Sequence, residues 1–290
     1  MKTKTALVVG GTDGIGAAVA LELCKQGARV IIIGRSKEKA SNVVEASKML
    51  QTNGTIEVVV SDFSLMNNVK NTVKQLKEST TTIDVLVYTV GILITKTEHT
   101  PEGIEKDFAV SYLSRFVCTE ELQAQGLLTD ATIMLNVAAS APKVPSYAQM
   151  EFSNVQEVQS RVGMKSHGQA QLANDIFTQF AASRYGITTI GYGPGSVNTN
   201  IRRELPKFLV ALVQPFFAFS TREPQEVGRQ IASILANTNL KKGQAQYFDK
   251  NGAFTVSPFI ADSKRQNELL ATSIALSDYA LSKDYQLHHS

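Results

Sequence analysis

The hydrophobic pattern of the chain alternates short apolar runs with segments in which apolar residues recur at helical spacing. Runs typical of buried parallel strands lie at 6–9, 28–33, 55–60, 83–88, 131–138, 187–192 and 244–249. Helices are predicted from residue 14 onward and at 37–51, 67–78, 100–126 and 224–237, with an amphipathic tail at 267–282. This order predicts an α/β fold, a doubly wound parallel sheet of about seven strands with helices on both faces.

Residues 6–16 form the most informative stretch, since an apolar run passes directly into a glycine cluster and then into a helical repeat. Gly10, Gly14 and Gly16 let the backbone turn sharply and approach a ligand closely. The N-terminus of the helix that follows offers free N–H groups and a positive dipole end to a pyrophosphate. A dinucleotide site is therefore predicted, and the alternative is an ordinary glycine turn between two elements.

Composition and charge narrow the class of protein. The 290 residues are 43% hydrophobic, enough for one substantial core, and a single domain over 1–290 is expected. A net charge of +3 with interspersed signs predicts no nucleic-acid partner. No apolar run is long enough to span a bilayer, no leader is expected before the first strand, and Cys24 and Cys118 are expected as buried thiols. A cytoplasmic protein is therefore predicted, and no metal site.

The glycine turn reads Gly10-x-x-x-Gly14-Ile15-Gly16 and resembles that of the short-chain dehydrogenase/reductase family, a group of Rossmann-fold proteins. Val9 stands where the family usually has Thr. The resemblance implies that Thr12 and Ile15 contribute to the cofactor turn along with the three glycines. Similarity continues over almost the whole chain, to the segment beginning at Leu269, and is strongest to the retinol-dehydrogenase-like branch.

The choice of nicotinamide cofactor depends on the end of the second strand, at Gly34-Arg35. No acid stands there to bind a ribose 2′-hydroxyl, whereas Arg35 can pair with the 2′-phosphate of NADP(H). The alternative is a solvated Arg35. In the family an Asp at the position of Asp62 binds adenine, although Asp62 could also cap the next helix.

The segment after the fourth strand departs from the family pattern. Gly91 is the one residue kept from the usual Asn-Asn-Ala-Gly and is expected beside the cofactor. Ser111 stands in place of the Asn that holds a proton-relay water in the family. A hydroxyl can bind water but cannot reproduce both halves of an amide.

The positions that carry the family's catalytic groups also differ. The Ser that polarises the substrate carbonyl falls on Ala139, and Ser140 could substitute only if the backbone shifts by one residue. The family's catalytic Tyr and Lys fall on His167 and Gln171, which share a helix face. His is a competent proton donor near neutral pH, while Gln171 could bind the nicotinamide ribose without a charge.

Alternatives remain for the proton donor. His167 is either a proton donor or a polar residue left in a site without redox chemistry. Tyr112, Tyr147 and Tyr192 are candidates for a displaced donor. A second alignment frame with Lys165 as the Lys places Arg161 at the Tyr position, and we discount it because Arg stays protonated.

The loop after the sixth strand resembles the family's Pro-Gly-x-Val-x-Thr loop that packs on the nicotinamide. Its residues here are Pro194, Gly195, Val197 and Thr199. A hydrophobic stretch then follows. The resemblance implies that a substrate lid lies around 200–222 and that the substrate is large and hydrophobic. A membrane-touching surface and a dimer contact are the alternatives for this stretch.

Three hypotheses follow. The first is an NADP(H)-dependent oxidoreductase with an atypical site, acting on a hydrophobic carbonyl or alcohol, or on an activated C=C or C=N bond. The second is a non-redox enzyme of the same fold, such as a cyclase, isomerase or dehydratase. The third is a catalytically inactive NADP-binding protein. A homo-oligomer is expected from the resemblance alone.

Overall fold

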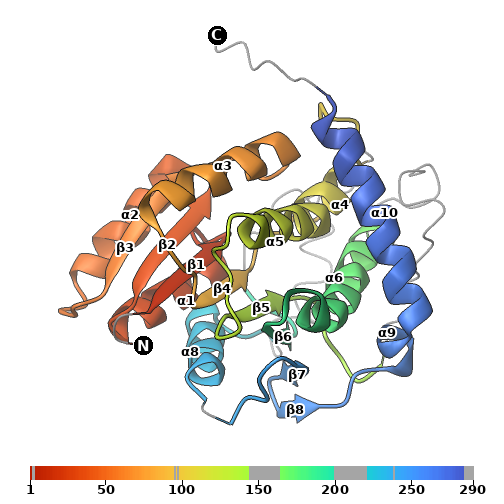
Figure 1. Cartoon of the computed structure of the whole chain (residues 1–290). Helices are drawn as coiled ribbons and strands as arrows, with labels where there is room; N and C mark the ends of the chain where they lie inside the picture. The colour runs from red at the N-terminus through yellow and green to blue at the C-terminus, as the bar shows by residue number, and fades with distance from the viewer. Residues whose placement is uncertain are drawn as a thin grey trace.

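The computed structural model describes residues 1, 4–94, 96, 98–143, 164–198, 221–237 and 239–283 (Figure 1). Within these residues the strands join one sheet in the order β3-β2-β1-β4-β5-β6-β7-β8. The strands are β1 (Thr5–Val9), β2 (Arg29–Gly34), β3 (Thr55–Val60), β4 (Val85–Tyr88), β5 (Ile133–Val137), β6 (Thr188–Gly193), β7 (Ala245–Asp249) and β8 (Gly252–Phe254). The helices are α1 (Gly14–Lys25), α2 (Lys37–Lys48), α3 (Met66–Ser79), α4 (Lys106–Phe108), α5 (Ser114–Ala124), α6 (Met164–Tyr185), α8 (Pro224–Leu235), α9 (Pro258–Ala261) and α10 (Ser263–Leu281).

The strand order reverses between β1 and β4, which confirms the doubly wound topology predicted from the sequence. The chain runs outward from β1 through β2 to β3, returns to β4 on the other side of β1, and continues outward to β7. In register, Val9 lies opposite Ile33 on one side and Tyr88 on the other. The carboxyl ends of these strands therefore meet at one edge, where such sheets bind ligands.

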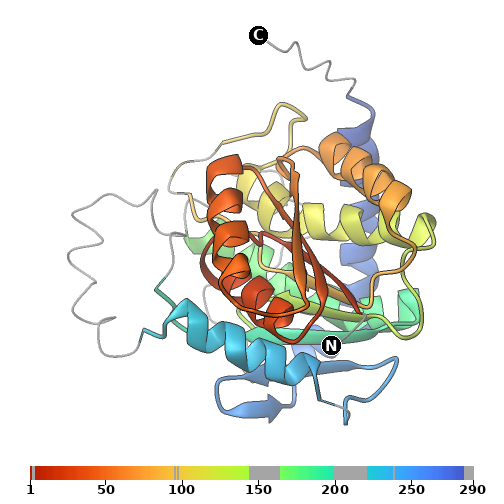
Figure 2. The same cartoon turned by 90° about the vertical axis from the view of Figure 1, so that its left-hand side faces the viewer.

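Two apolar layers cover the two faces of the sheet. Strand β1 shows the division, because Ala6 and Val8 pack with α1, α2 and α8, whereas Leu7 and Val9 pack with α3, α5 and α6. This is the period of two expected of a strand buried on both faces. In two perpendicular views α8 lies on the opposite side of the molecule from α3 and α10 (Figure 2).

The edge of the sheet and the 100–126 segment differ from the predictions. An eighth strand, β8, pairs antiparallel with β7, where about seven parallel strands were expected. The single helix expected at 100–126 begins at Lys106, because Gly103 adopts a φ of +81° and Glu105 caps the helix. A π-helical turn, Ala109–Leu113, then separates α4 from α5.

The N-caps of α8 and α3 differ in kind. The N-cap of α8 is Glu223, and Pro224 occupies the first turn of the helix. Helix α3 begins after Leu65, and its first amides are capped by the buried Glu102, which accepts Met66 N at 2.6 Å and Asn67 N at 3.0 Å. Asp62 lies in the turn before this helix, where its carboxylate accepts Ser64 N at 2.9 Å.

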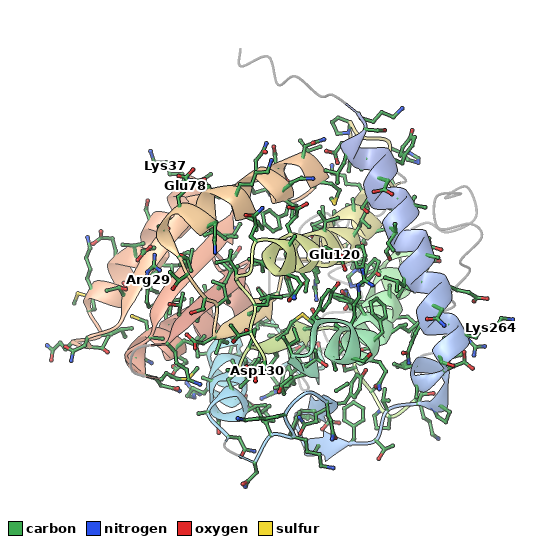
Figure 3. The ribbon with its side chains drawn as sticks, in the orientation of Figure 1. Arg29, Lys37, Glu78, Glu120, Asp130 and Lys264 are labelled. Carbon is green, nitrogen blue, oxygen red and sulfur yellow. The ribbon has the colours of Figure 1, made fainter. Side chains whose placement is uncertain are left out.

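Figure 3 labels charged side chains of both signs on the described part of the chain: Arg29, Lys37, Lys264, Glu78, Glu120 and Asp130. Arg29 on β2, for example, forms two hydrogen bonds of 2.7 Å to Glu57 on β3. Cys24 and Cys118 are both buried free thiols, as expected. Over the described parts of the chain, none of the helices combines the length and the apolar composition that crossing a bilayer requires.

Candidate functional site

The turn between β1 and α1 brings the backbone of three glycines very close together. Gly10 has a φ of +89° and Gly14 a φ of +52°, values that favour glycine. A Cβ added at Gly16 would lie 2.2 Å from Gly10 O and 2.5 Å from Thr89 Oγ1. The turn therefore leaves no room for side chains, which is the geometry of a backbone cradle for phosphate at a helix N-terminus.

Asp13 occupies the N-cap of α1, inside this turn. Its side chain accepts a hydrogen bond from Gly14 N at 2.8 Å and forms an ion pair with Lys39 of α2. A carboxylate at this place would repel a pyrophosphate, so the cation of Lys39 compensates a charge beside the candidate phosphate site.

The end of β2 has no space for an acid. A Cβ added at Gly34 would lie 2.5 Å from both Thr12 Cγ2 and Thr12 Oγ1, so Thr12 occupies the space that a side chain at Gly34 would need. Arg35 follows and is exposed. Among the described residues nothing forms a hydrogen bond or ion pair with its guanidinium, which leaves it available to an anion.

Asp62 follows β3, and Gly91 follows β4. One carboxylate oxygen of Asp62 accepts Ser64 N at 2.9 Å, which orders the turn after β3. Gly91 follows β4, and a Cβ added there would lie 3.4 Å from Ser111 Oγ. Gly91 thus adjoins the cluster of polar side chains described below.

The loop after β6 carries Pro194, Gly195 and Val197, while Thr199 lies outside the described residues. Val197 forms a parallel bridge with Arg222, and Asn198 N donates to Arg222 O at 3.0 Å. The loop and the start of the segment before α8 are therefore joined through the backbone. The expected lid around 200–222 is described only at its last two residues.

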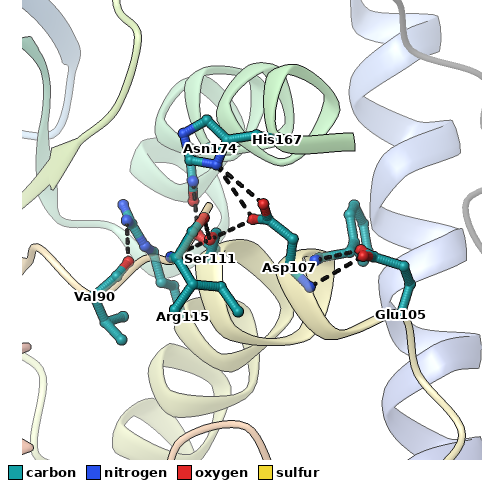
Figure 4. Close-up of polar contacts among 9 residues, drawn as sticks. Val90, Glu105, Asp107, Ser111, Arg115, His167 and Asn174 are labelled. Carbon is teal, nitrogen blue, oxygen red and sulfur yellow. Dashed lines mark hydrogen bonds and ion pairs between the residues drawn. The ribbon is translucent and has the colours of Figure 1, made fainter. Parts of the chain in front are cut away.

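A polar cluster of Asp107, Ser111 and His167 lies where the π-helical turn meets α6 (Figure 4). His167 Nδ1 lies 3.3 Å from Asp107 Oδ1 and 3.2 Å from Oδ2. Asp107 is fully buried, whereas the His167 side chain is 16% exposed. The predicted proton-donor position thus contacts a buried carboxylate that the sequence analysis did not identify.

Ser111 is held by this cluster on both sides. Its hydroxyl donates to Asp107 Oδ1 at 2.7 Å and accepts Ile92 N at 3.1 Å. Its backbone carbonyl accepts Asn174 Nδ2 of α6 at 2.8 Å. Both the side chain and the carbonyl of Ser111 thus fix the π-helical turn, and π-turns recur at functional sites.

Gln171 lies one helical turn after His167, and its side chain forms no hydrogen bond among the described residues. Ala139 is partly exposed, whereas Ser140 is 3% exposed and donates to Asp175 of α6. The structure therefore brings Ser111 and His167 together around Asp107, and places the Ser140 hydroxyl on a different carboxylate.

Two buried charges lie beneath the site. Arg115 is 2% exposed and donates to Val90 O at 2.6 Å and to Val137 O at 2.9 Å, which joins the loop after β4 to the end of β5. Burial lowers the pKa of Arg115 to about 9. Burial also raises the pKa of Asp175 to about 7, although the Ser140 hydrogen bond and the charge of Arg115 oppose the shift.

Two of the three tyrosines considered as displaced donors form hydrogen bonds away from the polar cluster. Tyr112 is fully buried, and its hydroxyl pairs with Ser273 of α10 at 2.6 Å. Tyr192 packs in the layer on the opposite face of the sheet, where its hydroxyl donates to Gln230 at 2.7 Å. Tyr147 lies outside the described residues.

Sequence reasoning did not identify Lys39, Asp107, Arg115 and Asp175. For Arg115 and Asp175 a signal existed, because each is a charged residue within an apolar helical repeat. Asp107 stands four residues before Ser111, which is one helical turn, but its contact with His167 spans 60 residues and required the fold. No three His, Cys, Asp or Glu side chains gather into a metal-binding group in the described part of the chain.

Comparison with known proteins gives consistent matches. The family model described as short chain dehydrogenase matches residues 4–154. Human polyprenol dehydrogenase is 27% identical over 211 residues, 70% of this chain and 63% of that protein, so the match leaves more than a third of that relative uncovered. Retinol dehydrogenase 14 from Mus musculus is 29% identical over 75% of this chain and 67% of its own length.

Solved structures share the fold at lower identity. The RhlG/NADP active-site complex from Pseudomonas aeruginosa is 20% identical, with a TM-score of 0.66 over 86% of this chain and 96% of its own. At this identity the likeness concerns the fold alone.

Proposed function

Because the chain belongs to the short-chain dehydrogenase family, whose members bind a nicotinamide cofactor, we propose that it is an NADP(H)-dependent oxidoreductase acting on a hydrophobic small molecule. The observation that carries the choice of cofactor is the end of β2, where Thr12 fills the space at Gly34 and Arg35 is exposed. A 2′-phosphate would find a guanidinium there, and a bare ribose would find no carboxylate.

The residues present fit such a cofactor. The glycine turn offers a cradle that a Cβ would fill, Asp62 keeps a carboxylate oxygen beyond its turn contact, and the amide of Gln171 is unengaged among the described residues. Gly91 and the loop from Pro194 would lie along the nicotinamide half. When bound, the cofactor supplies or accepts a hydride.

His167 is the proposed proton donor and acceptor, since it takes the family's Tyr position and is partly exposed beside the buried Asp107. Ser111 supports it through Asp107, and Ser140 would act from its place on Asp175 by holding the loop after β5. In the register that the resemblance implies, positions 167, 171 and 139 are His, Gln and Ala, where the family has Tyr, Lys and Ser. Orientation and one proton donor would then carry most of the catalysis.

A hydrophobic substrate is proposed from two kinds of support. The relatives named for polyprenol and retinol are dehydrogenases of isoprenoid alcohols by their names. The segment at 208–219 is rich in Phe, Leu, Val and Ala. A carbonyl or alcohol is the first candidate, with an activated C=C or C=N bond as the alternative acceptor. A homo-oligomer and a cytoplasmic location stay predictions.

The test is titration with NADPH beside NADH at neutral pH. We expect tighter binding of NADPH, and in Arg35→Ala a loss of about 10- to 150-fold that is specific to NADPH, since one charge-assisted contact is worth about 1.5–3 kcal/mol. Arg229→Ala, which removes an exposed arginine from α8, is the matched control. Equal affinity for NADH, or no effect of Arg35→Ala, would contradict the cofactor assignment.

A second candidate function, a non-redox enzyme of the same fold, is favoured by one observation. Ala139 places a methyl group where the family polarises a carbonyl, while His167 with Asp107 can still move a proton. Product formed without a change in the absorbance of NADPH, and lost in His167→Phe, would support this second function. Binding of NADPH without turnover of any tested substrate would favour an inactive NADP-binding protein.

A further inference from the structure

We propose that Asp107 is a positioning residue that fixes the tautomer of His167, so that Nε2 is the ring atom that exchanges a proton with the substrate. The catalytic meaning of this inference rests on the proposed function. The tautomer of the His167 ring in the protein without substrate does not depend on the proposed function.

The first step concerns Asp107, whose carboxylate accepts hydrogen bonds in a fully buried place. Ser111 Oγ accepts the Ile92 amide at 3.1 Å and directs its single hydrogen to Asp107 Oδ1 at 2.7 Å, because its other acceptor, Ile92 O, lies farther away at 3.5 Å. An oxygen that accepts a hydroxyl hydrogen at this distance does not itself carry the proton. We treat the Asp107 carboxyl as ionised, because a carboxylic acid is a stronger acid than an imidazolium, and both of its oxygens lie near His167 Nδ1.

The second step concerns the ring. An ionised carboxylate has no hydrogen to donate, so His167 Nδ1, at 3.2 and 3.3 Å from the two oxygens, must carry the hydrogen that joins them. Nε2 then bears a lone pair in the neutral ring and a hydrogen in the imidazolium. In Figure 4 the second ring nitrogen points away from Asp107.

Other charged groups near α6 have different partners. Glu105 accepts Asp107 N at 3.2 Å and Phe108 N at 2.7 Å, and it also interacts with Ser166. Asp175, two turns along α6, accepts from Ser140, and Arg115 of α5 donates to backbone carbonyls. Among the described residues, Asp107 is thus the charged side chain that contacts the His167 ring.

The proton balance is simple. In reduction of a carbonyl, the substrate carbon receives a hydride from the reduced cofactor and its oxygen receives the Nε2 proton. The Nε2–H bond breaks, an O–H bond forms on the substrate, and the imidazolium becomes a neutral ring whose Nδ1–H still donates to Asp107. The 16% exposure of His167 allows reprotonation from water, and oxidation of an alcohol runs through the same atoms in reverse.

The experiment is ¹⁵N NMR of the full chain labelled at histidine, recorded where His167 is neutral and assigned with His167→Phe. We expect the Nδ1–H tautomer in the wild type. In Asp107→Asn the Ser111 hydroxyl still donates to Oδ1, so the new amide NH₂ faces Nδ1 and drives His167 to the Nε2–H tautomer. An Nε2–H tautomer in the wild type, or an unchanged tautomer in a folded Asp107→Asn, would overturn the proposal.

Two further variants separate the carboxylate from its surroundings. Asp130→Asn removes an exposed acid before β5 and should leave the His167 signals unchanged. Ser111→Ala removes a partner of Asp107 but keeps the carboxylate, so the Nδ1–H tautomer should remain. If Asp107→Asn does not fold, the wild-type and Ser111→Ala spectra still decide the matter, since an Nε2–H tautomer in either contradicts the inference.

Turnover of retinal with NADPH gives the second readout. We expect kcat of Asp107→Asn to fall by about 10²–10⁴, with KM changed only a few-fold, because the donor ring is present in the wrong tautomer. His167→Phe should be as severe, and the double variant no worse, because the two residues act as a unit. A kcat close to wild type in Asp107→Asn would overturn the positioning role, whereas the expected tautomers with no turnover would contradict the proposed function alone.

Discussion

Lys39 of α2 forms an ion pair with Asp13 at the N-terminus of α1, inside the glycine turn. The pair places opposite charges on the two helices that border the candidate adenosine site. It links the turn after β1 to the segment after β2, the two places from which a phosphorylated nucleotide would be held.

The first prediction follows from this pair. Lys39→Met should weaken NADPH binding about two- to fivefold, because the negative charge of Asp13 then lacks this cation beside the phosphates and an exposed pair is worth up to about 1 kcal/mol. Isothermal titration of NADPH measures the effect. Asp13→Asn in the Lys39→Met background should restore most of the affinity, and an equal loss in both variants would contradict the explanation.

The second prediction concerns the close approach at Gly16. Gly16→Ala should lower the free energy of unfolding by about 1–3 kcal/mol, because its Cβ would meet the carbonyl of Gly10 at 2.2 Å. NADPH binding should be lost as well, since the cradle must open. Gly228→Ala is the comparison, because its Cβ would meet the backbone of Ala18 at 2.8 Å between α8 and α1. That variant should lose stability and still bind NADPH.

The third prediction concerns Arg115. Arg115→Met should lower the free energy of unfolding by about 2–5 kcal/mol, because two buried carbonyls lose their donor and Asp175 loses a nearby cation. Denaturation in urea measures this. Adding Asp175→Asn should recover part of the loss by removing the remaining buried acid, and a strictly additive double variant would show that the two charges are not coupled.

The fourth prediction is a pH dependence from Asp175, whose pKa burial raises from 3.8 to about 7. Between these values the folded protein binds a proton that the unfolded chain releases, so this group makes stability fall as pH rises from about 4 to 7. The free energy of unfolding of the wild type minus that of Asp175→Asn should therefore decrease over this window, by at most about 1.4 kcal/mol per pH unit. A difference that is flat or rises with pH would contradict the assignment.

The sequence predicted the sheet well because apolar runs and glycine turns are local signals. Strand β3 begins and ends at the predicted residues 55 and 60, and the ligand-binding edge of the sheet follows from the order of elements. The prediction of one helix at 100–126 was wrong because the spacing of apolar residues does not reveal a π-helical turn. The residue that caps α3 was not predicted because Glu102 lies 36 residues away along the chain.

The candidate site could be predicted in part. The spacing of the motifs predicted Ser111, His167 and Gln171 as candidate site residues. His167 and Gln171 lie on successive turns of α6. The spacing of a motif does not predict which groups its side chains will contact. Whether a hydroxyl at 139 or 140 faces the site depends on the path of the loop after β5, and Ser140 turns to Asp175. The contact between Asp107 and His167 could not be predicted from spacing either, because the two residues are brought together only by the fold.

The hydrogen bond between Tyr112 and Ser273 joins residues 161 positions apart, one beside Ser111 and the other on α10. During synthesis the N-terminal strands, with the glycine turn, leave the ribosome first and can begin to pack. The π-helical turn gains this partner on α10 only after a further 161 residues have been synthesised. A nascent chain can therefore begin to pack its glycine turn well before Tyr112 has its partner.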